Sequence, residues 1–150
     1  MNILIKSLII SSLLMISCKK ESVESASTSM DALSTTDFLG QWKFKGYSDG
    51  KMPVYDVTIE FKKEEGKYSL NGRSSVNFYF ASFETNENTK TMKISAIGST
   101  KMAGMPEANQ FETVYYERLQ NLERYEFKDK NVLALYLSNP VKEVMYFERK

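Results

Sequence analysis

One stretch of this chain, residues 91–127, joins a strand pattern, a polar loop, a helix pattern and a second strand pattern in direct succession. Its central part is the one convincing amphipathic helix beyond residue 17, because its large apolar side chains recur at steps of three and four residues. A helix with a single apolar stripe needs a sheet to cover that stripe, and the other segments are typical of strands. The stripe comprises Phe111, Val114, Tyr115, Leu119 and Leu122.

Short segments with apolar side chains at every second position precede and follow the helix, as in half-buried strands. In the first segment, Trp42 and Phe44 share a face. In the fourth, the same alternation predicts that Phe78 and Phe80 lie in the core and leaves Tyr79 exposed. The predicted strands are Gly40–Tyr47, Val54–Phe61, Lys67–Asn71, Val76–Phe83, a fifth with Met92, Ile94 and Ala96, a sixth with Tyr125 and Phe127, a seventh with Leu133, Leu135 and Leu137, and Val144–Glu148.

Turn and helix-start signals separate these elements. The dipeptide Asn71-Gly72 predicts a turn, and Pro106 suits the first position of the helix, after a loop from Gly98 to Met105. Eight short strands at hairpin spacing and one helix predict an α+β domain. We expect a strongly curled antiparallel sheet, forming a partial barrel, with the helix packed on it.

The first 17 residues are typical of an export signal. A lone charge at Lys6 precedes an apolar run from Leu8 to Ile16, which is too short for a permanent membrane-spanning helix. The run ends in Met15-Ile16-Ser17-Cys18, which resembles the lipobox of bacterial lipoproteins, and Cys18 is the only cysteine of the chain. We therefore expect residues 1–17 to be a lipoprotein signal peptide and Cys18 to be lipidated.

Lipidation would tether the protein to a membrane, since two or more acyl chains anchor a protein stably where one does not. Residues 18–36 are rich in serine and threonine and hold few large apolar groups, so we expect a flexible tether with a reach of about 25 Å. The folded domain is then expected over residues 37–150. Its location would be the bacterial cell envelope, facing the periplasm or the cell surface.

Charge and composition exclude several function classes. Without Lys6, the 20 basic side chains fall to 19 and equal the 19 acidic ones, so the exported protein lacks the basic footprint of nucleic-acid binding. The absence of histidine excludes Ser-His and Cys-His catalysis and ordinary zinc sites. The sequence also holds no phosphate-binding glycine loop and no calcium loop. We expect no catalytic residues, no metal and no cofactor.

Several motifs, kept in order along the chain, resemble the META domain family, the HslJ-like domain of small bacterial envelope lipoproteins. The resemblance covers nearly all of residues 37–150. It implies the fold and the envelope compartment, with a link to stress tolerance in some members, but no settled biochemical activity. The motifs are Phe38-Leu39-Gly40-Gln41-Trp42, Val57–Phe61, Asn71–Phe83, Ile94–Pro106, Glu112–Leu119 and Met145–Arg149.

The chain departs from the family pattern at two places. Many members have cysteine where this chain has Val76, and cysteine again where it has Gly104. Because both cysteines are missing together, the resemblance implies that they pair in the members that have them. This chain would then lack that disulfide, which is typically worth a few kcal/mol.

Asn77, Thr100 and Glu112 are polar residues at the places where the resemblance is strongest. Glu112 lies beside the apolar stripe of the helix, where a carboxylate is costly to desolvate unless donors meet it. We expect those donors to be the Thr100 hydroxyl and backbone N–H groups of the loop from Gly98 to Met105. The three side chains either anchor this loop to the sheet or line a binding site at the open end of the sheet.

Two function classes follow from these observations. The first, which we prefer, is a non-catalytic, membrane-anchored envelope lipoprotein whose domain binds an envelope partner or serves stress tolerance. The second is a small-ligand-binding module that uses the groove or mouth of the curled sheet. A deep pocket would favour the second class, and a flat exposed aromatic patch would favour the first.

Cys18 provides the first testable prediction. The intact mass of protein extracted from membranes should show the loss of residues 1–17 and the gain of acyl chains. A Cys18→Ser variant should leave the membrane fraction, and its quantitative retention there would contradict the lipobox interpretation.

Overall fold

The computed structural model describes residues 38–138 and 141–150. The predicted signal peptide, Cys18 and the tether of residues 18–36 lie outside the described residues. Within the described part, no helix has both the length and the apolar character needed to cross a membrane.

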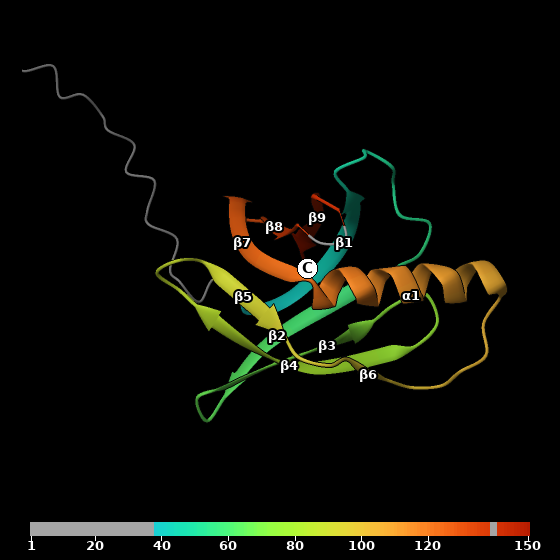
Figure 1. The fold of residues 1–150 in the computed structure, drawn as a ribbon, viewed down its shortest axis with the longest axis horizontal. Helices are drawn as coiled ribbons and strands as arrows, with labels where there is room; N and C mark the ends of the chain where they lie inside the picture. The colour runs from blue at the N-terminus through green and yellow to red at the C-terminus, as the bar shows by residue number, and fades with distance from the viewer. Residues whose placement is uncertain (1–37, 139–140) are drawn as a thin grey trace, which may run out of the picture. The chain divides into compact units, whose positions relative to one another are not determined.

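The described residues form one helix and a sheet of short antiparallel strands (Figure 1). The strands are β1 (Gly40–Tyr47), β2 (Thr58–Glu64), β3 (Lys67–Arg73), β4 (Phe78–Asn86), β5 (Thr91–Ile94), β6 (Gly98–Ser99), β7 (Leu122–Asp129), β8 (Val132–Leu137) and β9 (Glu143–Arg149), and the helix is α1 (Pro106–Gln120).

The sheet closes on itself. Its strand order is β3-β2-β1-β9-β8-β7-β5-β4, and β3 also pairs with β4, so eight strands complete an antiparallel barrel. The α+β class and the curled antiparallel sheet are confirmed, but the prediction of a partial barrel is wrong. Register explains the closure: five residue pairs, from Ser69↔Ser82 to Arg73↔Phe78, join β3 to β4 without a gap.

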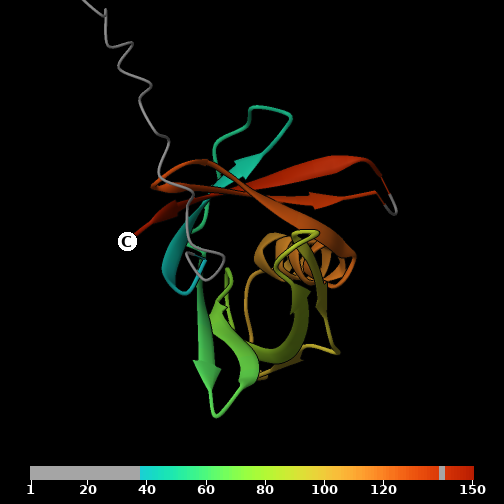
Figure 2. The same ribbon diagram turned by 90° about the vertical axis from the view of Figure 1, so that its left-hand side faces the viewer.

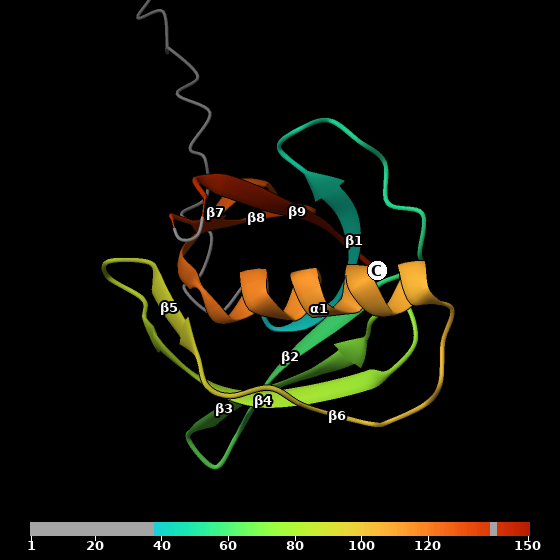
Figure 3. The same ribbon diagram turned by 45° about the vertical axis from the view of Figure 1, so that its right-hand side comes forward.

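Helix α1 lies between the half of the barrel built from β7, β8 and β9 and the half that contains β2, β3 and β4 (Figures 2 and 3). Pro106 occupies its first turn and Glu107 follows, as predicted. The Tyr115 ring packs 5.7 Å from the ring of Phe44 in β1 and 5.7 Å from that of Tyr79 in β4. The helix therefore fills the interior that the strands enclose.

The buried face of α1 differs from the predicted stripe. Its buried residues are Ala108, Glu112, Tyr115 and Leu119, while Phe111 is half-buried. Leu122 is buried too, but it belongs to β7, because the helix ends at Gln120. A carboxylate thus occupies the helix face that the pattern assigned to apolar groups alone.

The predicted facing of β4 is wrong. Tyr79 is 1% exposed, whereas Phe78 and Phe80 are 57% and 61% exposed. Three consecutive aromatic residues do not show which of them point inward. The rest of the strand shows the facing, because Ser82 and Glu84 lie on the same face as Phe78 and Phe80. Burying that face would bury the serine and the glutamate as well.

The predicted turn at Asn71-Gly72 is also absent, since β3 continues through both residues to Arg73. Gly72 is needed there for close approach. A Cβ atom at this position would lie 2.1 Å from the Thr58 carbonyl oxygen and 2.7 Å from the Tyr79 hydroxyl. The glycine therefore makes room for the buried phenol rather than bending the chain.

Several element boundaries differ from the prediction. Strand β4 spans Phe78–Asn86 rather than Val76–Phe83. Strand β2 begins at Thr58 rather than Val54, and Val54 is 88% exposed in the connection from β1. Ala96 lies beyond β5 and is exposed. The predicted loop after β5 contains β6, a two-residue strand that pairs with Tyr79 and Phe80 of β4.

Trp42 is a core residue, as predicted, and its indole N–H donates to the Phe38 carbonyl oxygen at 2.7 Å. The Arg149 guanidinium lies over its ring at 4.4 Å. Trp42→Ala should lower the free energy of unfolding by about 3–5 kcal/mol, because it leaves a cavity and an unpaired carbonyl. Urea denaturation measures this, with the outward-facing Lys43→Ala as a near-neutral control. Fluorescence typical of a solvated indole in the wild-type protein would contradict this burial.

Candidate functional site

The three polar residues singled out in the sequence come together beside the start of α1. We define the Glu112 cluster as Ser74, Asn77, Thr100, Glu112 and Tyr116. Its members come from the turn between β3 and β4, from the loop after β6 and from α1. Ser74, Asn77 and Glu112 are buried polar residues, with exposed fractions of 1%, 5% and 9%.

Asn77 and Ser74 hold the Glu112 carboxylate. The Asn77 backbone N–H donates to Oε2 at 2.9 Å, and its side-chain Nδ2 donates to Oε1 at 2.7 Å. The Ser74 hydroxyl donates to Oε2 and itself accepts a hydrogen bond from the Tyr116 hydroxyl at 3.1 Å. Both carboxylate oxygens therefore have donors, as a buried charge requires.

Asn77 links the carboxylate to the loop after β6. Its Oδ1 accepts from the Thr100 hydroxyl at 2.8 Å and from the Met102 backbone N–H at 2.7 Å. The Thr100 hydroxyl also accepts from the Phe78 backbone N–H at 3.2 Å. The Asn77 side chain thus donates to Glu112 of α1 through Nδ2 and accepts from the loop through Oδ1.

The prediction that Thr100 and loop N–H groups would meet Glu112 directly is therefore wrong. They meet Asn77, because its planar amide spans the space between the loop and the carboxylate. Sequence reasoning also missed Ser74 and Tyr116. Ser74 lies two residues after Gly72, in a segment with a turn signal. Nothing in the sequence indicates that it contacts Glu112, which lies 38 residues further along the chain.

Electrostatics keep Glu112 ionised. Burial opposes the charged form, but the hydrogen bonds from Ser74 and from Asn77 outweigh it and hold the pKa of Glu112 below its usual value. Burial, together with the nearby Glu112 charge, raises the pKa of Tyr116 to about 12. At neutral pH the cluster is one anion with neutral donors.

The turn that carries Ser74 and Asn77 also packs on the loop after β6. A Cβ atom at Gly104 would lie 2.4 Å from a methyl group of Val76, and the Ser75 hydroxyl donates to the Ala108 carbonyl at 2.6 Å. Positions 76 and 104, where the family resemblance implies a pair of cysteines, are therefore adjacent in this fold. Here a valine methyl fills the space that the glycine leaves open.

A second polar group lies inside the barrel. The Tyr79 hydroxyl donates to the Thr58 carbonyl at 2.9 Å and lies 2.8 Å from the Tyr115 hydroxyl. Burial raises the pKa of both phenols above their ordinary value, so both stay neutral. Tyr79 is thus a core residue with a hydrogen-bonded hydroxyl group, and not the exposed side chain that strand alternation predicted.

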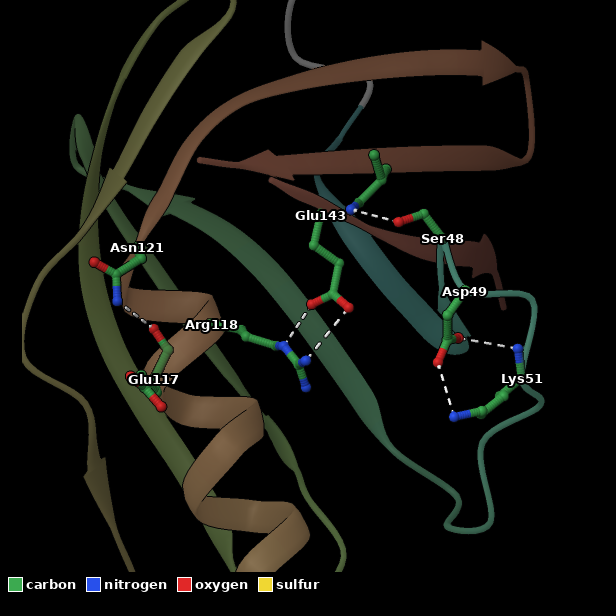
Figure 4. Close-up of polar contacts among 8 residues, drawn as sticks. Ser48, Asp49, Lys51, Glu117, Arg118, Asn121 and Glu143 are labelled. Atoms are coloured by element: carbon green, nitrogen blue, oxygen red, sulfur yellow. Dashed lines mark hydrogen bonds and ion pairs between the residues drawn. The ribbon is translucent and has the colours of Figure 1, made fainter. Parts of the chain in front are cut away.

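The C-terminal half of α1 is tied to β9 by a partly buried ion pair (Figure 4). The Arg118 guanidinium contacts both carboxylate oxygens of Glu143, and it also lies 4.1 Å from the centre of the Tyr47 ring. Next to it, the Val144 N–H donates to the Ser48 hydroxyl at 3.2 Å. These contacts tie the C-terminal half of the helix to β9 and to the end of β1.

The surface offers an aromatic patch and an open groove. Phe78 and Phe80 stand side by side on the outer face of β4, and the ring of Phe80 lies over Gly98 of β6. The groove, of about 610 Å³, lies between the β4–β5 hairpin and the end of α1, where a single residue pair joins β5 to β7. In the described residues, no three His, Cys, Asp or Glu side chains gather as metal ligands.

The sequence and the fold of this chain resemble those of known proteins. The sequence profile of the META domain matches residues 22–150. The chain belongs to the META domain family. No curated protein is similar enough in sequence to count as a relative.

Two solved structures share the fold of this META domain. One is the NMR structure of a protein from Burkholderia xenovorans, with a TM-score of 0.60 and 19% identity over 77% of this chain and 86% of that one. The other is the crystal structure of a DUF4847-family protein from Bacteroides vulgatus, with a TM-score of 0.52 and 17% identity over 77% and 95%. At these identities the likeness concerns the fold alone.

Glu112 provides a test of how this META domain is held together. Glu112→Gln places an amide N–H₂ against the donors of Ser74 or Asn77, so it should lower the free energy of unfolding by about 1–3 kcal/mol. Glu117→Gln, on the exposed face of the same helix, is the matched control. Equal stability of the two variants in urea would contradict a structural role of the cluster.

The wild-type protein and the Glu112→Gln variant also provide a test of pH dependence. Because the pKa of Glu112 is lowered in the folded state, its contribution is present above the ordinary glutamate pKa of about 4.3 and is lost as the pH falls through the folded pKa. The stability difference between wild type and Glu112→Gln should therefore shrink below about pH 4.

Proposed function

We propose that this protein is a non-catalytic, lipid-anchored lipoprotein of the cell envelope whose META domain binds a partner through the outer wall formed by β4 and β6. The observation that carries the proposal is the exposure of two neighbouring phenylalanines, Phe78 and Phe80, on that wall. Large aromatic side chains that folding leaves in water are typical of recognition surfaces.

The two rings are pre-positioned for binding. Phe80 lies over Gly98, where an added Cβ would come within 2.6 Å of the ring. The Phe78 backbone N–H donates to the Thr100 hydroxyl at 3.2 Å, and the Phe78 carbonyl accepts from the Thr100 N–H at 3.0 Å. Arg73 is the residue opposite Phe78 on β3. A partner that covers this wall would lose little side-chain entropy there, which favours binding.

The arrangement of buried polar groups supports a role without catalysis. The carboxylates of Glu112 and Glu143 and the hydroxyls of Tyr79 and Tyr115 are all engaged in internal contacts. Side chains used in this way stabilise the barrel and leave the outer wall as the chemically distinctive feature. The lipid anchor at Cys18 would hold this wall near the membrane. A partner in the cell envelope would also fit the link of some family members to stress tolerance.

A second candidate is binding of a small ligand in the groove between the β4–β5 hairpin and the end of α1. Its volume of about 610 Å³ lies in the range of ligand sites, and Gln120, Asn121 and Thr91 offer polar groups. A small molecule that co-purifies with the wild-type protein and is lost from Gln120→Trp would favour this candidate. Its retention in that variant would count against it.

The aromatic wall is tested by replacing both rings. Phe78→Ser/Phe80→Ser should abolish capture of the envelope partner from membranes by the Cys18-anchored protein while changing the unfolding temperature little, because both side chains are exposed. The control is Val141→Ser, which removes a 51% exposed apolar group from the connection between β8 and β9. Capture that survives in the double variant, or is lost equally in the control, would refute the wall as the binding surface.

A further inference from the structure

Apart from the aromatic wall and Val141, which is 51% exposed in the connection between β8 and β9, the large exposed apolar side chains of the described residues lie on two loops. These loops are residues 48–57, between β1 and β2, and residues 100–105, between β6 and α1. We define the four apolar tips as Met52, Val54, Met102 and Met105, which are 72%, 88%, 48% and 73% exposed. Exposed apolar groups of this size are candidates for an interaction surface where they gather on one side of the molecule.

Both loops lie on the side of the barrel where α1 begins (Figures 1 and 3). The loop of residues 48–57 reaches α1 through Tyr55, whose ring lies 5.0 Å from that of Phe111. The loop of residues 100–105 is fixed by Asn77 through the Met102 N–H and by Asn109, which donates to the Gly104 carbonyl at 3.0 Å. Tyr55 therefore holds one loop against α1, and Asn77 of the Glu112 cluster holds the other.

We propose that the four apolar tips insert into the surface of the phospholipid bilayer to which the protein is anchored, so that the start of α1 faces the membrane. This inference rests on the proposed lipid anchor at Cys18. It adds a second membrane contact, made by the folded domain itself, and thereby assigns the domain a fixed orientation.

The chemistry of the tips favours a lipid surface over a protein partner. They are three methionines and a valine, and none of the four tips is one of the tryptophan, tyrosine or arginine residues that dominate packed protein interfaces. Exposed aliphatic side chains fit a soft interface, where membrane binding scales with the apolar area inserted. The aromatic wall on β4 is the contrasting case, because its exposed side chains are aromatic rings on the outer face of the barrel.

The charges of the two loops are compatible with phospholipid headgroups. Asp56 pairs with Lys43 at 2.7 Å, and Asp49 pairs with Lys51 at 3.6 Å. Lys101 is the only charged residue of the loop of residues 100–105. Glu107, in the first turn of α1, faces solvent beside the end of this loop. Apolar insertion, with Lys101 beside phosphate groups, therefore meets little repulsion.

The tether length allows this contact. Strand β1 starts at Gly40, close to the end of the tether, and leads directly into the loop of residues 48–57 at its far end. Eight residues of strand span about 25 Å, and the tether of residues 18–36 has a similar expected reach of about 25 Å. The anchored domain can thus place its loop tips on the bilayer that holds Cys18.

A fluorescent probe on the loop tests the contact. In the lipidated protein Cys18 is blocked, so a cysteine introduced at Ala103 is the only free thiol and leaves all four tips intact. An environment-sensitive dye there should shift to the blue and be quenched by spin-labelled lipids when the protein is reconstituted in phosphatidylethanolamine and phosphatidylglycerol vesicles. The same dye on Asn88→Cys, in the β4–β5 hairpin, should behave as in water.

A double variant, Met102→Ser/Met105→Ser, makes the test specific. It should reduce the inserted fraction of the probe at residue 103 about tenfold or more, because two apolar side chains no longer leave water. The emission of the buried Trp42 reports that the variant remains folded. Equal probe behaviour at residues 103 and 88 would overturn the proposal, and so would insertion that survives in the double variant.

Other occupants of the loop surface give distinct results. A blue shift that appears without vesicles and grows with protein concentration would indicate a second copy of this chain, and one that needs added envelope proteins would indicate a protein partner. Either result would overturn membrane contact. The intact mass of the same preparation reports the anchor separately, so an unlipidated product would refute the proposed anchor without deciding the loop surface.

Discussion

The buried carboxylate of Glu112 joins three parts of the fold that lie far apart in the sequence. It receives its hydrogen bonds from the turn between β3 and β4, and through Asn77 it is linked to the loop between β6 and α1. An ionised side chain at this depth is stable only because both of its oxygens are met by donors. The same bonds therefore fix the end of the barrel at which α1 begins, and both proposed surfaces depend on that end for their geometry.

Aromatic side chains fill the barrel interior. Tyr115 of the helix and Tyr79 of β4 share a hydrogen bond there, and Arg118 ties the far half of the helix to Glu143. The features on which both proposals rest lie on the outside of this META domain. Its rigid aromatic wall suits a protein surface, whereas its apolar loop tips suit a fluid one.

Much of the fold was predictable because strand alternation is a local property. Trp42 and Phe44 in β1, Leu133 and Leu135 in β8, and the helix start at Pro106 follow directly from spacing and from the chemistry of proline. The errors arose where local patterns are ambiguous. Three aromatic residues in a row hid the facing of β4, and an Asn-Gly pair that usually turns the chain lies within β3, because Tyr79 needs the space above Gly72.

The candidate site shows the same division. The sequence by itself determined which polar residues mattered: Asn77, Thr100 and Glu112 stood out by their place in the motifs and by the oddity of a carboxylate beside an apolar stripe. Only the tertiary structure decided how they are joined, that Ser74 and Tyr116 belong with them, and that the barrel closes through β3 and β4. The physical reason is that propensity and alternation act over a few residues, whereas a hydrogen bond between residues 74 and 112 exists only once the closed sheet has brought them within reach.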